Sequence, residues 1–213
     1  ARRPTWSEIR VDAARLPVVL LVLLNVGYFA NWSSVFFLFK GFAERQGIGN
    51  VGAFFSVQMG LMIAVRLGAG RLFDTVDKAR LVGASFATIA LGHLALDRLP
   101  GVWAVPFLGA LFGIGLGAGY PSLNGLMFEI SPPRFRALGA NLMLFAVQAG
   151  FFLGPVAGGA LVAGRGYHGY FTVSAAMALA AAAASLALAR RRRATAPVPE
   201  ARPGAAGDPP GRS

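Results

Sequence analysis

The sequence has no cysteine, two histidines and few charged residues. Without cysteine, disulfides, thiolate chemistry and Cys-based metal sites are excluded. Charged residues make up only 14% of the chain, which is too few to cover the surface of a soluble domain of this size. The sequence also lacks Gly-x-Ser-x-Gly, His-Glu-x-x-His and a phosphate-binding loop. It therefore gives no reason to expect an enzyme, a cofactor or a bound metal.

What the chain has instead is long uncharged runs, at 16–39, 46–65, 81–96, 99–128, 137–164 and 166–189. A helix needs about 20 apolar residues to cross a bilayer, and five of the six runs are that long. The short run at 81–96 can still span, because Arg80 and Arg98 can extend their side chains to the two interfaces. With a mean hydropathy of +0.58, the sequence predicts an all-α membrane protein. We expect six transmembrane helices, at about 16–41, 50–73, 80–97, 102–130, 137–163 and 168–190.

The charges between these runs are sorted by side. A net charge of +11 would by itself also suit a nucleic-acid-binding protein. With six alternating spans, however, the basic residues gather on one side, which the positive-inside rule assigns to the cytoplasm together with both termini. Lipids rather than nucleic acid are therefore the expected partner, and the arginine-, alanine- and glycine-rich composition favours a bacterial inner membrane. The crowded side receives Arg2, Arg3, Arg10, Arg15, Arg71, Lys78, Arg80, Arg134, Arg136, Arg190, Arg191, Arg192 and Arg193, and the other side receives only Lys40, Arg45, Arg98 and Arg165.

The two ends of the chain differ from its middle. Residues 1–15 are polar and basic, and we expect them to form an interfacial segment with Ser7 as a helix cap. Residues 191–213 begin with arginines and continue with proline, alanine and glycine, a composition that cannot bury a core and predicts a disordered cytoplasmic tail. The predicted organisation is thus a linker at 1–15, a transmembrane domain at 16–190 and a tail at 191–213.

A short charged loop at 66–80 separates the second and third predicted helices. Asp74 can accept hydrogen bonds from the free N–H groups at the start of another helix and complement its positive pole. Arg71, Lys78 and Arg80 can hold the turn at the lipid headgroups. The simpler alternative is that these charges only set the topology.

The order Arg66-x3-Gly70-Arg71-Leu72-x-Asp74-x2-Asp77-Lys78-x-Arg80 resembles the signature loop of the major facilitator superfamily. Thr75 and Asp77 stand where the family pattern usually has a basic residue and a glycine. The resemblance implies a loop that latches the two halves of a transporter in the outward-open state. It implies that the latch consists of Arg66, Gly70, Arg71, Asp74, Lys78 and Arg80. The candidate charge partners of Asp74 are Arg66, Glu129 and Arg136.

Two further segments extend the resemblance to residues 16–190. Residues 113–121 followed by 132–140 look like the fourth helix of a superfamily repeat and its basic turn. Residues 150–159 look like the next helix, whose glycine-proline pattern is associated with antiporters when it stands in the N-terminal half. A complete member carries two six-helix halves. Because the start resembles the central linker and the tail a C-terminus, we interpret the chain as the C-terminal half, with an N-terminal half in the same full-length chain or in a partner. A first-half origin is the alternative.

Glycines recur every four residues in the fifth predicted helix, at Gly150, Gly154 and Gly158. This spacing places them on one face, where a neighbouring backbone can approach closely. Pro121 and Pro155 remove backbone donors in mid-span and are expected to bend or weaken their helices. Together with Gly117, these residues indicate tight packing, a hinge or sliding surface for a conformational cycle, or both.

Uncharged polar residues lie inside several predicted helices. Asn25, Tyr28 and Asn31 are spaced three apart and can share a face, and amides beside aromatics suit a cavity for an amphipathic organic solute. The alternative is that the amides hold helices together. No aspartate, glutamate, lysine or arginine is expected near mid-membrane, and His93 is expected at the outer interface rather than as a proton carrier. The cavity candidates are Asn25, Tyr28, Asn31, Trp32, Gln58, Asn124 and Gln148.

These features predict transport of a small organic solute by alternating access, as one half of a major facilitator superfamily bundle. The resemblance favours an efflux permease of the drug or sugar branch. The alternative is a non-transporting membrane module, or a truncated half that needs a partner half. A channel is disfavoured, because no charged ring or re-entrant filter is visible.

Overall fold

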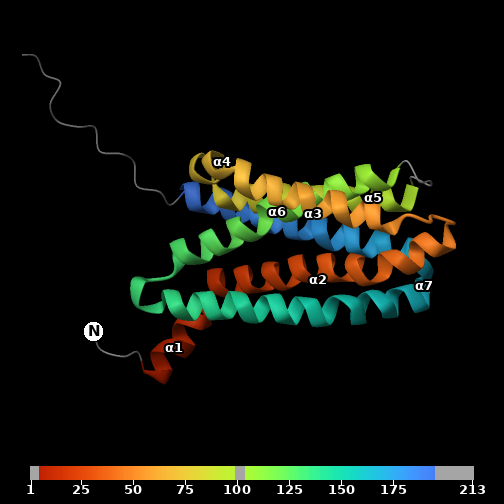
Figure 1. The fold of residues 1–213 in the computed structure, drawn as a ribbon. Helices are drawn as coiled ribbons and strands as arrows, with labels where there is room; N and C mark the ends of the chain where they lie inside the picture. Colours follow the sequence, from red (N-terminus) through yellow and green to blue (C-terminus); the bar gives the residue numbers. More distant parts are fainter. Residues whose placement is uncertain (1–4, 99–103, 195–213) are drawn as a thin grey trace, which may run out of the picture.

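The structure is a computed structural model that describes residues 5–98 and 104–194, and in this part of the chain it contains helices and no strand. The helices pack into an elongated bundle (Figure 1). Its elements are α1 (Trp6–Ala13), α2 (Leu16–Arg45), α3 (Val51–Gly68), α4 (Gly70–Thr75), α5 (Lys78–Arg98), α6 (Ala104–Ile130), the 3-10 turn η1 (Pro133–Phe135) and α7 (Arg136–Ala194). The all-α prediction is confirmed.

Five described helices are long and apolar enough to cross a membrane, and the fifth of these candidates is α7. A straight helix of 59 residues would be about 90 Å long, whereas a bilayer core is about 30 Å thick. The chain instead reverses at Gly166, which has φ 69° and ψ −177°. These angles are open to glycine and not to other residues. Figure 1 shows the two arms of α7 running in opposite directions along the bundle, with α2 between them in this view. That both arms span the membrane, giving six spans, stays a prediction.

The second predicted helix, 50–73, is in fact two helices. The α3 helix ends at Gly68, and Ala69 links it to the short α4. Both prolines lie inside continuous helices, since α6 runs through Pro121 and the first arm of α7 runs through Pro155. That they bend or weaken these helices stays a prediction.

The N-terminal segment begins differently from the prediction. The helix cap is Thr5 and not Ser7, because Thr5 and Glu8 form a reciprocal capping box. The predicted tail lies largely outside the described residues, as do residues 1–4, and the part of it at 191–194 is the helical end of α7.

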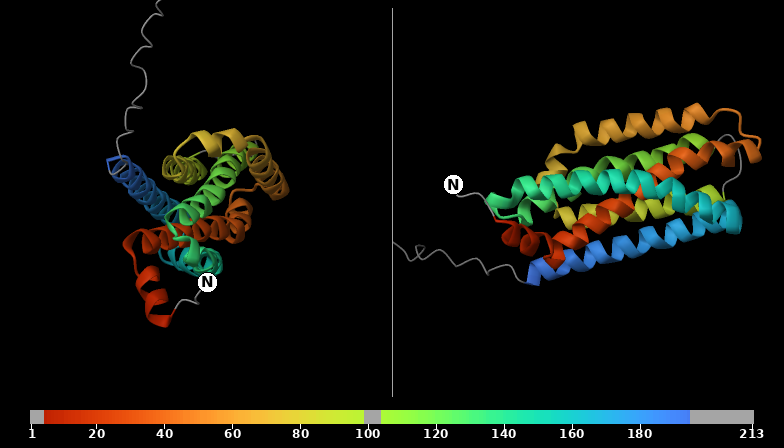
Figure 2. Two further views of the ribbon diagram at one scale, coloured as in Figure 1. Left: turned by 90° about the vertical axis from the view of Figure 1, so that its left-hand side faces the viewer. Right: turned by 90° about the horizontal axis from the view of Figure 1, so that it is seen from below.

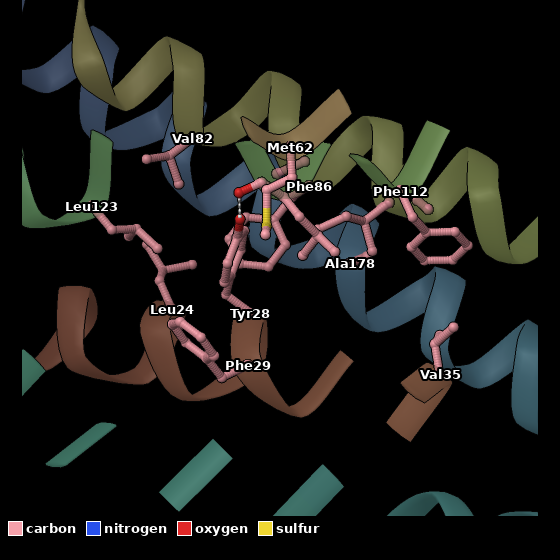
Figure 3. Packing of buried hydrophobic residues seen from close by; sticks show 14 of the residues in the cluster. Leu24, Tyr28, Phe29, Val35, Met62, Val82, Phe86, Phe112, Leu123 and Ala178 are labelled. Carbon is pink, nitrogen blue, oxygen red and sulfur yellow. Dashed lines mark hydrogen bonds between the residues drawn. The ribbon is translucent and has the colours of Figure 1, made fainter. Parts of the chain in front are cut away.

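The core lies where α7 meets α2 and α5, and where α6 meets α3 and α5. Aromatic side chains fill it, and Figure 3 shows Tyr28 reaching from α2 toward Phe86 and Met62. The Tyr28 and Phe86 rings meet edge to face at 5.8 Å, a favoured aromatic geometry. Seen end-on in Figure 2, α3 and the second arm of α7 lie at opposite flanks of the bundle.

The outside of the bundle is apolar. Leu67, Phe152 and Leu23 are 82%, 70% and 62% exposed, and many other large apolar side chains are exposed along the helices. A water-soluble domain does not expose apolar surface on this scale, whereas lipid tails accept it. This surface is that of a multi-pass membrane protein.

The two ends of the bundle carry different charge. The end with α1, α4, η1 and the C-terminus of α7 holds most of the basic residues, including Arg71, Arg134 and Arg191. The opposite end holds Lys40, Arg45, Arg98 and Arg165. The structure therefore gathers the basic residues at one end, as the sequence predicted. That this end faces the cytoplasm stays a prediction.

Candidate functional site

The signature loop is a compact turn built from α4 and the start of α5. Within α4, Thr75 Oγ1 donates a hydrogen bond to the Arg71 carbonyl at 2.8 Å. Asp77 Oδ1 accepts from the Arg80 backbone N–H at 3.1 Å. This is the hydrogen bond of a helix N-cap, so Asp77 stands where a side chain is needed to start α5.

Asp74 takes no part in these contacts. Its side chain is exposed, and within the described residues it makes no ion pair or hydrogen bond. The loop therefore presents one carboxylate outward.

None of the three expected charge partners joins Asp74. Glu129 Oε1 lies 2.7 Å from Lys78 Nζ, so this acid ties the end of α6 to the start of α5. The Arg136 guanidinium lies 4.0 Å from the ring centroid of Phe128, and Arg66 lies 5.8 Å from that of Tyr120. These cation–π contacts hold both arginines against α6.

Two of the polar candidates on α2 act between helices. Asn25 Nδ2 donates to the Met143 carbonyl at 2.9 Å, and Tyr28 Oη donates to the Leu116 carbonyl at 2.5 Å. Both side chains are fully buried. In this conformation Asn25 connects α2 to α7, and Tyr28 connects α2 to α6. Both therefore fit the alternative that these polar side chains hold helices together.

Asn31 lies beside a small, mostly apolar cavity between α2 and both arms of α7. The cavity measures about 50 Å³. Asn31 Nδ2 donates to the Gly27 carbonyl at 2.8 Å, while its buried Oδ1 has no partner among the described residues. Tyr170 Oη donates to Ser34 Oγ at 2.7 Å on the same wall. The cavity has room for a few water molecules and not for an organic solute, which needs about 300 Å³ or more.

The remaining polar candidates are scattered. Trp32 stacks among Phe29 and Phe151, and its Nε1 has no partner in the described part of the chain. Gln58 is buried on α3 with both side-chain polar atoms unpaired among the described residues. Asn124 Nδ2 donates to the Tyr120 carbonyl, and Gln148 is exposed on the first arm of α7. The structure thus does not bring the predicted cavity set together.

The glycine faces are close helix contacts. A Cβ on Gly150 would lie 2.6 Å from the Val26 carbonyl oxygen on α2, and one on Gly117 would lie 2.7 Å from Val65 Cβ on α3. Gly154 and Gly158 face α2 in the same way, against Ala30 and Leu38. Close packing is therefore confirmed, and a sliding role for these faces is not tested by this geometry.

The expectation that His93 lies at the interface is wrong. Its side chain is fully buried between Phe112, Tyr170 and Phe171, and its Nδ1 lies 3.0 Å from the Ile89 carbonyl. At the end of α5 away from most of the basic residues, Asp97 Oδ1 contacts His168 Nδ1 at 2.8 Å. Helix periodicity could have revealed this, since Ile89, His93 and Leu96 share the buried face of α5.

Sequence reasoning also missed Ser34 and Tyr170. Ser34 follows Asn31 by three residues and so shares its face, a signal that was available. Tyr170 comes from the second arm of α7, and its position depends on the reversal at Gly166. No local pattern indicates that contact.

Comparisons with known proteins agree with this architecture. The family profile described as Major Facilitator Superfamily matches residues 21–210. A 3-(3-hydroxy-phenyl)propionate transporter of Escherichia coli (strain K12) is 32% identical over 100 residues, which cover 47% of this chain and only 25% of that protein. The chain belongs to the Major Facilitator Superfamily. Members of this family are membrane transporters and not enzymes.

Proposed function

We propose that this chain is the C-terminal six-helix half of a transporter that moves a small organic solute by alternating access. In this proposal the protein lies in a bacterial inner membrane with both termini in the cytoplasm, and an N-terminal half completes it. The family match and the charge difference between the two ends of the bundle support this assignment.

The observation that carries the proposal is a stripe of exposed side chains on the first arm of α7. Asn141, Phe145, Gln148 and Phe152 are all exposed and recur at steps of three or four residues, so they share one helix face. Gln148 lies near the middle of this arm. An amide side chain that faces lipid hydrocarbon loses its hydrogen bonds to water. Moving an amide from water into an apolar medium without new hydrogen bonds costs roughly several kcal/mol. This face is therefore suited to a second protein half and a water-filled path.

The stripe also has the chemistry of a solute path. Aromatic rings supply apolar contact, and amides supply hydrogen bonds that orient a solute. The bundle's own cavity beside Asn31 is too small for this purpose. We therefore place the solute on the outer face of α7 and leave Asn31 as a secondary candidate.

The solute class follows from the chemistry of the stripe and from the relative. That relative is a transporter of 3-(3-hydroxy-phenyl)propionate, an aromatic carboxylate. We infer an amphipathic aromatic compound. Export is the proposed direction, on the resemblance of the chain to the drug and sugar efflux branches of the family.

The test is flux in membrane vesicles that hold the full-length natural protein. Radiolabelled 3-(3-hydroxyphenyl)propionate is the first probe, followed by other aromatic acids. Export predicts accumulation in everted vesicles, and accumulation only in right-side-out vesicles would contradict that direction. Phe152→Ala should change KM or the preferred solute. The matched control is Leu91→Ala, which alters another exposed apolar side chain, on α5.

Failure of this test has a defined meaning. If no aromatic solute moves, or if Gln148→Leu and Phe152→Ala leave the solute profile unchanged, the stripe is not the solute path. Absence of flux for every solute class would favour the non-transporting membrane module.

A further inference from the structure

Arg66 carries a positive charge that no acid balances among the described residues. It stands in the last turn of α3, and its side chain is exposed. Its guanidinium carbon lies 5.8 Å from the ring centroid of Tyr120 on α6, and within the described residues it forms no ion pair with a carboxylate. The charge is therefore open to an anion from outside the described chain.

The contact with Tyr120 places this charge deep along the bundle. Tyr120 stands ten residues before Ile130, the last residue of α6, and ten residues span about 15 Å of helix. That is about half of a bilayer core of about 30 Å. Helical side chains lean toward the N-terminus of their helix, so Arg66 points back along α3 and away from the basic end. A charged group at this depth is costly to keep, which makes a functional site the first explanation to test.

An aromatic cluster extends from Tyr120 to the first arm of α7. The ring centroid of Phe29 on α2 lies 5.2 Å from that of Tyr120 and 5.6 Å from that of Phe151. Trp32 contacts Phe29 and Phe151 in turn. Tyr120, Trp32 and Phe151 are only partly buried, so the cluster leaves aromatic surface open. Phe151 follows Gln148 by three residues, so the cluster reaches the exposed stripe on α7.

We propose that Arg66 binds the carboxylate of the solute, while this aromatic cluster packs against the solute's ring. A guanidinium can donate to both oxygens of a carboxylate at once, and aromatic rings attract one another in edge-to-face or offset contacts. The inference rests on the proposed function, which supplies an amphipathic aromatic solute, and it narrows that solute to an aromatic carboxylate. Arg66 then selects for charge, and the stripe at Gln148 completes the site.

The experiment measures binding to the purified full-length protein in detergent, so it does not require transport. Radiolabelled 3-(3-hydroxyphenyl)propionate and its neutral amide are each titrated against the protein. The unchanged protein should bind the acid about tenfold more tightly than the amide, or more. Arg66→Gln should weaken binding of the acid by about tenfold or more, the effect of losing charge-assisted hydrogen bonds, and should leave binding of the amide unchanged.

Two further variants accompany this one. Arg45→Gln is the matched control, because Arg45 also lies over a tyrosine ring, 5.2 Å from the centroid of Tyr167, but at the opposite end of the bundle. It should bind both ligands as the unchanged protein does. Arg66→Lys keeps the charge but loses the planar fork, so its loss of acid binding should be smaller than that of Arg66→Gln. Arg66→Lys also serves as the test if Arg66→Gln does not fold.

Three results would overturn the inference. One is that the unchanged protein binds the acid no better than the amide, or does not bind it. Another is unchanged binding of the acid in Arg66→Gln. The third is an equal loss of acid and amide binding in that variant, which would mean that Arg66 supports the fold or pairs with an acid of the other half. Acid binding without flux would instead contradict the proposed transport and leave the Arg66 site in place.

Discussion

Lys78 Nζ lies 2.7 Å from Glu129 Oε1, and this ion pair joins the first residue of α5 to the last turn of α6. The pair fixes the base of the signature loop. Glu129 is thus engaged with Lys78, and within the described residues the Asp74 carboxylate takes part in no ion pair or hydrogen bond. The Lys78–Glu129 ion pair thus anchors the loop, and the Asp74 carboxylate is exposed on its surface.

Reversing this pair tests its contribution to stability. Glu129→Lys should lower the free energy of unfolding by about 0.5–1 kcal/mol, since both side chains are partly exposed and solvent screens the attraction. The double variant Lys78→Glu with Glu129→Lys should recover most of that loss. Thermal unfolding in detergent measures both. A double variant no more stable than the single would mean that the pair contributes nothing.

Asp74→Asn should slow solute flux severalfold while leaving membrane insertion intact. Asparagine keeps the size of the side chain but removes the negative charge that complements a helix start. Asp77→Asn is the matched control, because asparagine caps a helix as well as aspartate does and should leave α5 and flux unchanged. Equal flux in Asp74→Asn and the unchanged protein would mean that the charges of this loop only set the membrane topology.

The close contact of α2 with the first arm of α7 can be tested at one glycine. Gly150→Ala should destabilise the bundle by about 1–3 kcal/mol, because the new Cβ would lie 2.6 Å from the Val26 carbonyl oxygen. Gly159→Ala, on the same arm, meets nothing within 4 Å and should be neutral within about 1 kcal/mol. Chemical unfolding in detergent distinguishes them, and equal effects would contradict the packing described for α2 and α7.

The N-terminal helix should respond to acid through Glu8. Hydrogen bonds from the Thr5 backbone and side chain, aided by Arg134, lower the pKa of this carboxyl below its ordinary value of 4.5. The ionised form therefore stabilises α1 above about pH 4.5, and that stabilisation is lost as the pH falls through the lowered folded-state pKa.

Trp6 lies at the start of α1, so its fluorescence should change when α1 loses this stabilisation on acidification. Glu8→Gln should remove the transition. Glu44→Gln changes an exposed acid at the opposite end and should leave it unchanged. A transition that persists in Glu8→Gln would assign it to another group.

The membrane class, the helices and the packing faces could be predicted from sequence, because each depends on local periodicity or on the length of an uncharged run. Gly150 is an example, since its spacing alone placed it on a contact face. What could not be predicted depends on partners distant in the chain. Glu129 was paired with the wrong residue, and Tyr28 was assigned to a cavity, because their neighbours come from other helices. The buried position of His93 was available from periodicity but was outweighed by its closeness to a helix end.

The central claim is that this chain is half of a two-half transporter, and the size of the natural protein tests it most directly. An antibody against residues 194–213 would be used to blot native membranes under denaturing conditions. The account predicts a band near twice the 22.2 kDa of this chain. A band at 22.2 kDa, with no second six-helix protein copurifying, would contradict it.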